Sequence, residues 1–383
     1  DSLIADKLIA VQKQYHNPKA YTISWAKNQK REVVEIVRKL IYEGGSKLGL
    51  NLSVQTMDEK VLDIIKRKNL DTNRIEEVFE LCEQYGIPLY TELILGLPGE
   101  TVDSWKNNFY RLYEAGNHTG ITIYQAQLLE NAEMNLTQRK FYKMEGRTVY
   151  DYLVGTYNEH ELKEGVEVVI STRDLPSPKM IEAQVFSWFM NTFHINGVTN
   201  YISRVLHKHG VSYQEFYTKL FDYILKDQWL SSEIQRIEDH YGNWAKYGKI
   251  DHIPIQGMEI HGWNLVHSTI INMQSLDKHD HVFNVIEDFL RTHKFGLDES
   301  LLTDLIKFQR LFLIDYKDAK NYPKIETFDN DILGHLTENK ELKAQVTYEF
   351  DFPENKEMSL QQFCEQIFFA RRRNFGKSWL KSI

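Results

Sequence analysis

The sequence predicts an α/β fold, in which a partial (β/α) barrel in residues 1–135 is followed by a mainly helical region in residues 136–383. Three observations predict it. Short apolar strands alternate with amphipathic helices in the first region, which is typical of βαβ units and a parallel sheet. The clearest of these strands has one apolar and one polar face. From about residue 136 the alternation gives way to aromatic-rich helical patterns.

The first region contains four predicted strands and the helices between them. The strands are expected at 20–25, 48–55, 87–95 and 120–128, and the helices at 31–43, 59–67, 72–85 and 102–115. Asp58 and Thr101 are suited to cap the N-termini of two of these helices, and Gly86 to end a third. We expect the strands to be parallel and adjacent in chain order, with helices on one side and an exposed first edge.

Strand polarity favours a barrel over an open sheet. In residues 48–55 the apolar side chains alternate with polar ones, and Gln125 and Gln127 repeat the polar signal in the last strand. An open doubly wound sheet carries helices on both faces and is apolar throughout. One polar face therefore indicates a barrel-like sheet around a polar ligand cavity. Four strands cannot close a barrel, so we expect either an incomplete barrel or further strands upstream.

The second region is predicted to be helical over residues 150–170 and 178–240, with a loop region at 242–262. Two further helices are expected at 278–293 and 299–313, a strand at 344–352 and a helix at 359–373. The segment 251–263 is a candidate pocket lining. The basic stretch at 370–379 is either a solvated helix end or an anion-binding patch.

Composition excludes several classes of protein. The 383 residues hold 46 Lys and Arg against 54 Asp and Glu, a net charge of −8, which offers nucleic acid no global attraction. No apolar run is long enough to span a membrane. The two cysteines, Cys82 and Cys364, are expected to be reduced thiols of a cytoplasmic protein, and they cannot supply a four-cysteine metal site. None of the histidine pairs has the spacing of a metal site, so no metal ligand is assigned.

Two segments of the first region carry the strongest signals. Glu92–Thr101 is a strand that ends in a Gly-Leu-Pro-Gly turn, and ligands bind at the carboxyl ends of parallel strands. Gly96 and Gly99 allow a ligand to approach the backbone closely. The alternative interpretation is an ordinary strand–helix loop. In the other segment, Gln55 ends a strand and Arg67 follows near the end of a short helix, either as a surface charge or as a carboxylate clamp.

Together these segments resemble the radical S-adenosylmethionine (SAM) superfamily. The resemblance is carried by SVQTMDEKVLDIIKRKN, residues 53–69, and by LILGLPGET, residues 93–101. The stretch from Tyr21 to Met134 is similar to the cobalamin-binding subgroup, and the segment from Glu167 (EVVISTRDLPS) resembles the C-terminal region of that subgroup more loosely.

The resemblance implies a partial (β/α)₆ barrel that binds SAM over a [4Fe–4S] cluster and abstracts hydrogen from a small-molecule substrate, with cobalamin-dependent methyl transfer as one outcome. It places Gln55 and Arg67 on the methionine part of SAM, Glu92 on the ribose, and the Gly96–Pro98 turn near the adenine. Ser24, Trp25 and Asn28 would approach the same ligand. The full cofactor-binding set that we predict is Asn51, Ser53, Gln55, Arg67, Glu92, Ile94, Gly96, Pro98 and Gln127. No catalytic residue is assigned.

The sequence departs from this family in one large respect. The cluster-binding motif CxxxCxxC is absent, as are the GGEP-like strand and the cobalamin domain. We therefore expect the cluster ligands to come from a missing N-terminal half or from a second polypeptide, with this chain as the C-terminal part of the enzyme. An alternative is a non-catalytic interaction or SAM-binding subunit that completes a partner's barrel. A third is a generic βα-barrel enzyme that uses Glu92 as a base.

Overall fold

The computed structural model describes residues 1–17, 31–46, 49–69, 72–150, 165–248, 253–255, 258–260, 265–351, 357–364 and 380–383. The predicted strand at 20–25, with Ser24, Trp25 and Asn28, lies outside these residues. So do most of the segment 251–263 and all of 370–379. None of the described helices is long and apolar enough to cross a membrane.

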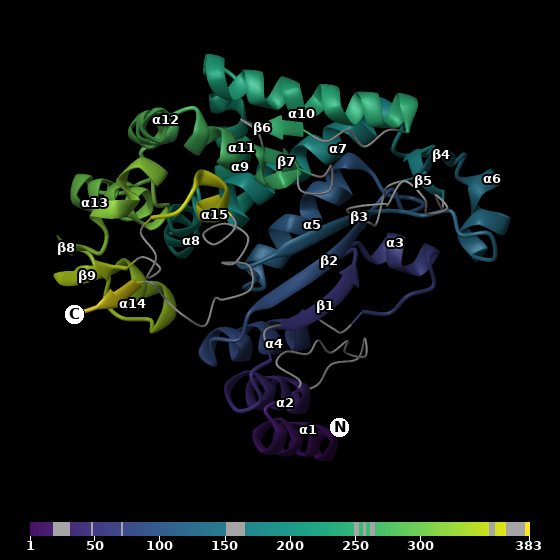
Figure 1. Ribbon diagram of the computed structural model, residues 1–383. Coiled ribbons are helices and arrows are strands. Elements are labelled where there is room, and N and C mark those ends of the chain that lie inside the picture. The colour runs from purple at the N-terminus through teal and green to yellow at the C-terminus, as the bar shows by residue number, and fades with distance from the viewer. Residues whose placement is uncertain are drawn as a thin grey trace.

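The centre of the first region is a parallel sheet with the strand order β1-β2-β3 (Figure 1). The strands are β1 (Leu50–Gln55), β2 (Leu89–Leu95) and β3 (Ile121–Gln125). Ser53 pairs with Glu92, and Glu92 with Thr122, so paired residues face the same side of the sheet. The predicted adjacency, order and direction are confirmed for these three strands. Closure into a partial barrel stays a prediction.

Burial differs between the two faces of this sheet. Leu50, Leu52 and Val54 of β1 are buried, whereas the alternate residues are partly exposed. β2 repeats this pattern along its whole length. The apolar side belongs to a core cluster that includes Trp105 and Phe109. The predicted apolar and polar faces are therefore present in β1 and β2.

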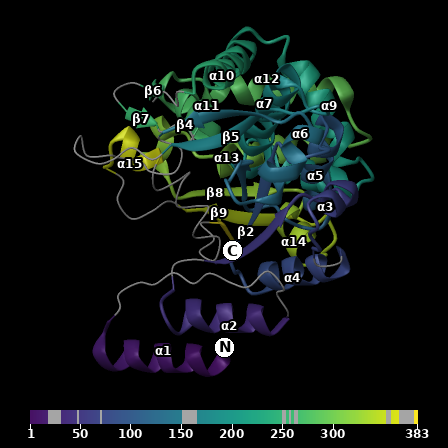
Figure 2. The ribbon, with the colours of Figure 1, turned by 90° about the vertical axis from the view of Figure 1, so that its right-hand side faces the viewer.

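The connecting helices follow the sequence prediction closely. They are α2 (Arg31–Tyr42), α3 (Glu59–Ile64), α4 (Thr72–Gln84) and α5 (Val102–Glu114), and α1 (Ser2–Tyr15) lies beside α2 below the sheet (Figure 2). The Asp58 side chain accepts a hydrogen bond from Val61 N at 2.9 Å. Thr101 and Ser104 form a capping box at α5. Both predicted caps are confirmed.

Two predictions for the second region are wrong. Residues 166–171 form a strand, β5 (Val166–Ser171), which pairs antiparallel with β4 (Glu145–Val149), where we expected a helix over 150–170. Val166, Val168 and Ile170 are β-branched and suit an extended backbone better than a helix. The expected loop from residue 242 is also wrong at its start, because α10 (Gln228–Tyr247) continues through Gly242.

The remaining elements form a mostly helical region with two small sheets. Strands β8 (Lys324–Phe328), β9 (Val346–Phe350) and β10 (Leu380–Ser382) form one antiparallel sheet, and β6 (Ile253–Ile255) pairs with β7 (Met258–Ile260). The helical elements are η1 (Met134–Gln138), α6 (Arg139–Phe141), α7 (Ser177–Met190), η2 (Asn191–Ile195), α8 (Asn200–Lys208), α9 (Tyr213–Ile224), α11 (Leu265–Ser275), α12 (His279–His293), α13 (Glu299–Phe312), η4 (Tyr316–Asn321), α14 (Ile332–Thr337) and α15 (Leu360–Cys364).

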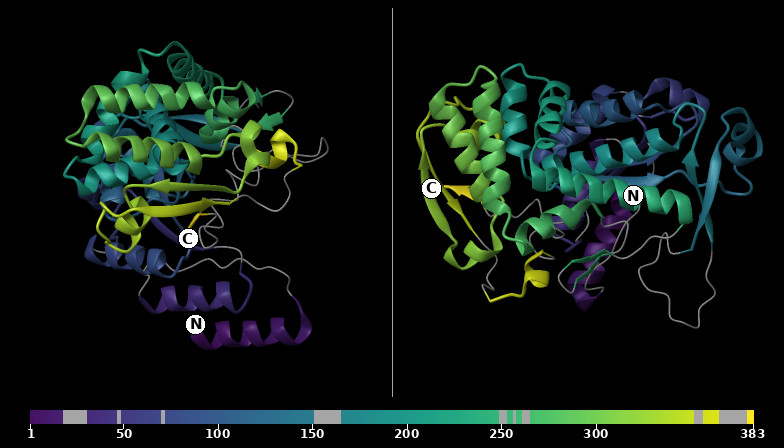
Figure 3. Two further views of the ribbon diagram at one scale, coloured as in Figure 1. Left: turned by 90° about the vertical axis from the view of Figure 1, so that its left-hand side faces the viewer. Right: turned by 90° about the horizontal axis from the view of Figure 1, so that it is seen from above.

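Both regions contribute to one continuous hydrophobic core. The largest cluster of buried residues includes Leu93 and Phe109 from the first region and Phe189 and Phe289 from the second. Figure 3, seen from above, shows the sheet of β8 and β9 at one end of the molecule and the β4–β5 pair at the other. The helical region therefore packs against the parallel sheet, and the predicted boundary at residue 135 stays a prediction.

Candidate functional site

Glu92 is the centre of a polar cluster on the partly exposed face of the parallel sheet. Asn51 Nδ2 donates to Glu92 Oε1 at 2.8 Å, and Ser53 Oγ donates to Glu92 Oε2. Asn51 and Ser53 come from β1 and Glu92 from β2, so strand pairing itself brings the three side chains together. Two neutral donors hold the carboxylate in a fixed orientation while leaving its negative charge uncancelled. Three predicted site residues therefore form one cluster.

Tyr124, which sequence reasoning did not assign to the site, belongs to the same cluster. It lies on β3 opposite Ile94, and its hydroxyl forms a hydrogen bond with Glu92. Burial raises the pKa of Tyr124, and the charge of Glu92 raises it further. The hydroxyl therefore stays protonated and donates to the carboxylate. The alternation of residue types along β3 was the sequence signal that could have assigned Tyr124 to this face.

Arg67 approaches this cluster from the segment that follows α3. Its Nη2 donates to the backbone carbonyl of Ser53, and its Nε donates to Asn69 Oδ1 at 3.2 Å. Partial burial lowers the pKa of Arg67, and the charge of Glu92 opposes that shift. The guanidinium is thus held beside the carboxylate by the end of β1, and the predicted Arg67–Glu92 proximity is present.

Gln55 lies at the carboxyl end of β1, as predicted, and is partly exposed like Asn51 and Ser53. A bulge between Ser53 and Gln55 shifts the pairing register, so that Gln55 pairs with Leu93 of β2. Its backbone is in the left-handed region with a φ of 63°. Such a conformation is uncommon for a non-glycine residue and is found more often at functional sites. The backbone conformation therefore sets Gln55 apart from the regular strand residues before it, while its partly exposed side chain keeps the alternation of β1.

The turn after β2 is held by a buried carboxyl group that sequence reasoning missed. Gly96 N donates to Glu100 Oε2 at 2.8 Å, and Glu100 is fully buried. Burial raises the pKa of Glu100 to about 8, so the group is largely protonated at neutral pH. Gly96 and Gly99 both have positive φ, and a Cβ on Gly99 would lie 2.5 Å from Ile64. Both glycines are therefore required by the turn itself.

The loop after β1 is fixed by α5. Asn108 Oδ1 accepts hydrogen bonds from Met57 N at 2.7 Å and from Thr56 Oγ1 at 3.2 Å. Arg111 donates to the Met57 carbonyl. Asn69 Nδ2 donates to the Thr56 carbonyl at 2.8 Å. The segment that carries Arg67 is thus anchored at several points, which orders it before any ligand arrives.

The remaining predicted residues lie along the same edge with different roles. Ile94 is partly exposed on the face of Glu92, whereas Pro98 is buried in the turn. Gln127 follows β3 and forms a β-bridge with Val168. We expected Gln125 on the polar face of the sheet, and this is wrong. Gln125 pairs with Leu95 on the buried side and donates to the Val169 carbonyl at 2.6 Å.

These residues fit SAM and do not fit an iron–sulfur cluster. A fixed carboxylate suits ribose hydroxyls, a guanidinium suits a carboxylate, and the Gly96 turn allows close approach to a flat ring. The sequence holds only two cysteines, and both are buried free thiols. Burial raises the pKa of Cys82 to about 12, which disfavours the thiolate that iron requires. Among the described residues no group of His, Cys, Asp and Glu could hold a metal ion.

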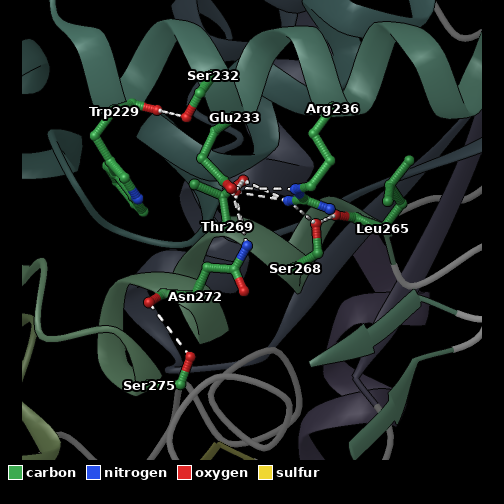
Figure 4. A network of polar contacts seen from close by, with 9 residues as sticks. All are labelled: Trp229, Ser232, Glu233, Arg236, Leu265, Ser268, Thr269, Asn272 and Ser275. Carbon is green, nitrogen blue, oxygen red and sulfur yellow. Dashed lines mark hydrogen bonds and ion pairs between the residues drawn. The ribbon is translucent and has the colours of Figure 1, made fainter. Parts of the chain in front are cut away.

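A second polar cluster lies between α10 and α11, in the helical region (Figure 4). Glu233 accepts hydrogen bonds from Thr269 Oγ1 at 2.8 Å and from Asn272 Nδ2 at 2.9 Å. Arg236 pairs with the same carboxylate through Nε at 3.1 Å and Nη2 at 2.6 Å. Ser268 Oγ accepts a further bond from Arg236 at 2.9 Å. This network satisfies Glu233 fully without a ligand.

Comparison with known proteins confirms the resemblance to the cobalamin-dependent radical SAM subgroup. The chain is 32% identical over 228 residues to the cobalamin-dependent radical SAM methyltransferase TokK of Streptomyces tokunonensis, which covers 58% of this chain and 33% of that protein. It is 32% identical over 211 residues to the 2-(S-pantetheinyl)-carbapenam-3-carboxylate methyltransferase of Streptantibioticus cattleyicolor, covering 54% of this chain and 30% of the relative.

A third relative is more distant. An uncharacterized protein of Methanocaldococcus jannaschii is 25% identical over 186 residues, which is 47% of this chain and 53% of that protein. No family model matches the chain. The chain thus spans about a third of the length of the two methyltransferases that it matches.

Proposed function

We propose that this chain, being similar to cobalamin-dependent radical SAM methyltransferases, forms the SAM-binding edge and part of the substrate-binding region of such an enzyme. The observation that carries the proposal is the Glu92 cluster, in which Asn51 and Ser53 orient a charged carboxylate beside Arg67 at the open face of a parallel sheet. When bound, SAM would supply the radical that abstracts hydrogen from a substrate, and cobalamin would supply the methyl group for transfer.

The residues of this chain would bind and orient SAM. Glu92 would accept hydrogen bonds from the ribose hydroxyls, and Asn51 and Ser53 hold its carboxylate in a fixed orientation for that purpose. Arg67 would bind the carboxylate of the methionine part. The turn at Gly96, held in place by the buried Glu100, would lie against the adenine. Ile94, on the same face of β2, would exclude water from the ring.

The ligands of the [4Fe–4S] cluster would come from outside these residues, because two buried thiols cannot hold it. We propose that a preceding segment of the same enzyme, or a second polypeptide with CxxxCxxC, supplies them and completes the barrel. The alternative of a subunit that binds SAM without cleaving it uses the same Glu92 cluster. The two differ only in whether the completed assembly forms 5′-deoxyadenosine.

Substitution of Arg67 tests the binding role. In the completed enzyme, Arg67→Ala should weaken SAM binding at least about tenfold, since a hydrogen bond to a charged group contributes about 1.5–3 kcal/mol. Lys68→Ala is the matched control, because it removes the same charge from an exposed neighbour. Calorimetric titration with SAM measures both variants. An unchanged affinity in Arg67→Ala would refute the assignment.

A further inference from the structure

A cavity of about 230 Å³ lies at the amino ends of β2 and β3, away from the Glu92 cluster. It is lined by Gly86 and Ile87 before β2, by His118 and Thr119 before β3, and by the end of η2 with part of α8. The candidate SAM site uses the carboxyl ends of the same strands. A cavity of about 150 Å³ is already enough to hold benzene. This space therefore has room for a ring-sized molecule.

One wall of the cavity is aromatic. The rings of Tyr201 and Phe312 meet edge to face with their centroids 4.7 Å apart, and Phe79 and Ile195 add further apolar surface. Gly197, with a φ of 91°, lets the backbone pass close to Phe312. Apolar walls with a few polar groups are typical of small-molecule sites.

Two charged side chains, Arg204 and Glu83, line the cavity. The side chain of Arg204 is 12% exposed, and its Nη2 is 2.8 Å from Oε1 of Glu83, whose side chain is 46% exposed. The positive charge of Arg204 acts on two histidines of the interior. Burial lowers the pKa of His118 and of His194, and the charge of Arg204 lowers both further. A guanidinium has five N–H donors. Within the described residues, Glu83 is the single carboxylate paired with Arg204.

His118 is the second polar group that a ligand would meet. Its Nδ1 lies 3.0 Å from Nε2 of His194, which is itself bound to Tyr217. This contact orients the imidazole, which lines the cavity. Burial holds His118 in the neutral form, so the imidazole adds a hydrogen-bonding group and no second charge.

We propose that this cavity binds a small monocarboxylate with a ring-sized apolar body, whose carboxylate meets Arg204 and whose body lies against Tyr201 and Phe312. The proposal is independent of the SAM site, because it uses the opposite ends of the strands. Glu83 is exposed and screened by solvent, so it competes weakly with a ligand carboxylate for the guanidinium. A neutral ligand of the same shape would lose the charged contact.

Titration with benzoate and with benzamide tests the proposal on the full chain. We expect benzoate to bind at least about tenfold more tightly than benzamide, and Arg204→Gln to remove that difference. Glu83→Gln should tighten benzoate binding, because it removes the competing carboxylate. Lys208→Gln is the matched control, since it removes a positive charge from the same helix without lining the cavity, and it should leave binding unchanged.

Three results would overturn the proposal. These are the absence of benzoate binding, equal binding of benzoate and benzamide, and a preference for benzoate that survives Arg204→Gln. Circular dichroism checks that Arg204→Gln is folded. If it is not, the benzoate-to-benzamide ratio in the folded parent chain decides the question, because a site without a contact to Arg204 predicts equal binding of the two. Loss of SAM binding through Arg67→Ala would leave all these results unaffected.

Discussion

The Glu92 and Glu233 clusters are built from similar groups and differ chiefly in how the arginine is placed. In each, an asparagine amide and a hydroxyl donate to a glutamate carboxylate, and an arginine lies nearby. Arg236 binds Glu233 directly through two nitrogens. Arg67 instead donates to the Ser53 carbonyl and to Asn69, and within the described residues it forms no ion pair with Glu92.

This difference in arginine placement distinguishes a network that stabilises the fold, at Glu233, from a site suited to bind a ligand, at Glu92. The side chain of Glu233 is 6% exposed and its charge is cancelled inside the protein, so it has nothing left to offer a ligand. Glu92 lies on a partly exposed face and forms no ion pair within the described residues, while neutral donors fix its direction. A carboxylate that is oriented but not neutralised is suited to bind a ligand with hydroxyl groups.

The largest expected effect is the difference in folding stability between variants of Glu233 and of Glu92. Glu233→Gln should lower the free energy of unfolding by about 3 kcal/mol, because it leaves the partly buried Arg236 without its counter-charge. Glu92→Gln should cost less than about 1 kcal/mol, because Ser53 and Asn51 can re-pair with an amide. Urea unfolding measures both, with the exposed Glu238→Gln as a control. Equal losses in the two variants would break the comparison.

Glu100 is a third kind of carboxyl group, fully buried and without an ion pair within the part of the chain that the structure describes. Its folded-state pKa, about 8, lies above the unfolded value, so the folded state binds more protons between about pH 4.5 and 8. The contribution of Glu100 to the free energy of unfolding is fully present below about pH 4.5 and is lost as the pH rises through about 8.

Glu100→Gln keeps an acceptor for Gly96 N but cannot ionise. The variant should therefore gain stability relative to the parent chain as the pH rises from 5 to 8, by on the order of 3 kcal/mol. Unfolding in urea at several pH values gives the difference curve. A curve that stays flat would show that Glu100 is ionised in the fold.

A smaller effect is expected when a hydroxyl donor is removed from either cluster. Tyr124→Phe removes a bond to Glu92 from a side chain that is 36% exposed, and should cost less than about 0.5 kcal/mol. Thr269→Val removes a bond to Glu233 at a fully buried position and should cost about 1–3 kcal/mol. Thermal unfolding compares the two, and a larger loss for Tyr124→Phe would count against an open Glu92 cluster.

Local sequence patterns predicted those parts of the site that depend on a single strand or on a single helix cap. Alternation in residues 50–54 gave the two faces, and the pairing of neighbouring parallel strands then brought Asn51 and Ser53 to Glu92. Asp58 and Thr101 were found as caps because their short polar side chains precede helical patterns. The Gly96 turn was found because a strand ended in two closely spaced glycines.

Features that depend on register or distant packing were not predictable in the same way. The bulge beside Gln55 shifts the pairing register of β1 against β2, and no residue type in the sequence indicates it. Gln125 faces the buried side because β3 pairs in register with β2, which its own sequence does not reveal. Glu233 meets Thr269 and Asn272 only when α10 and α11 pack together. β5 was missed although its β-branched run was a usable signal.

Anaerobic reconstitution with iron and sulfide tests most directly the central claim, that this chain binds SAM and receives its cluster from elsewhere. Cluster absorbance and 5′-deoxyadenosine would be measured for the chain alone and after addition of a polypeptide that carries CxxxCxxC. We expect neither signal from the chain alone and both from the pair. Substantial cluster and product from the chain alone would contradict the claim.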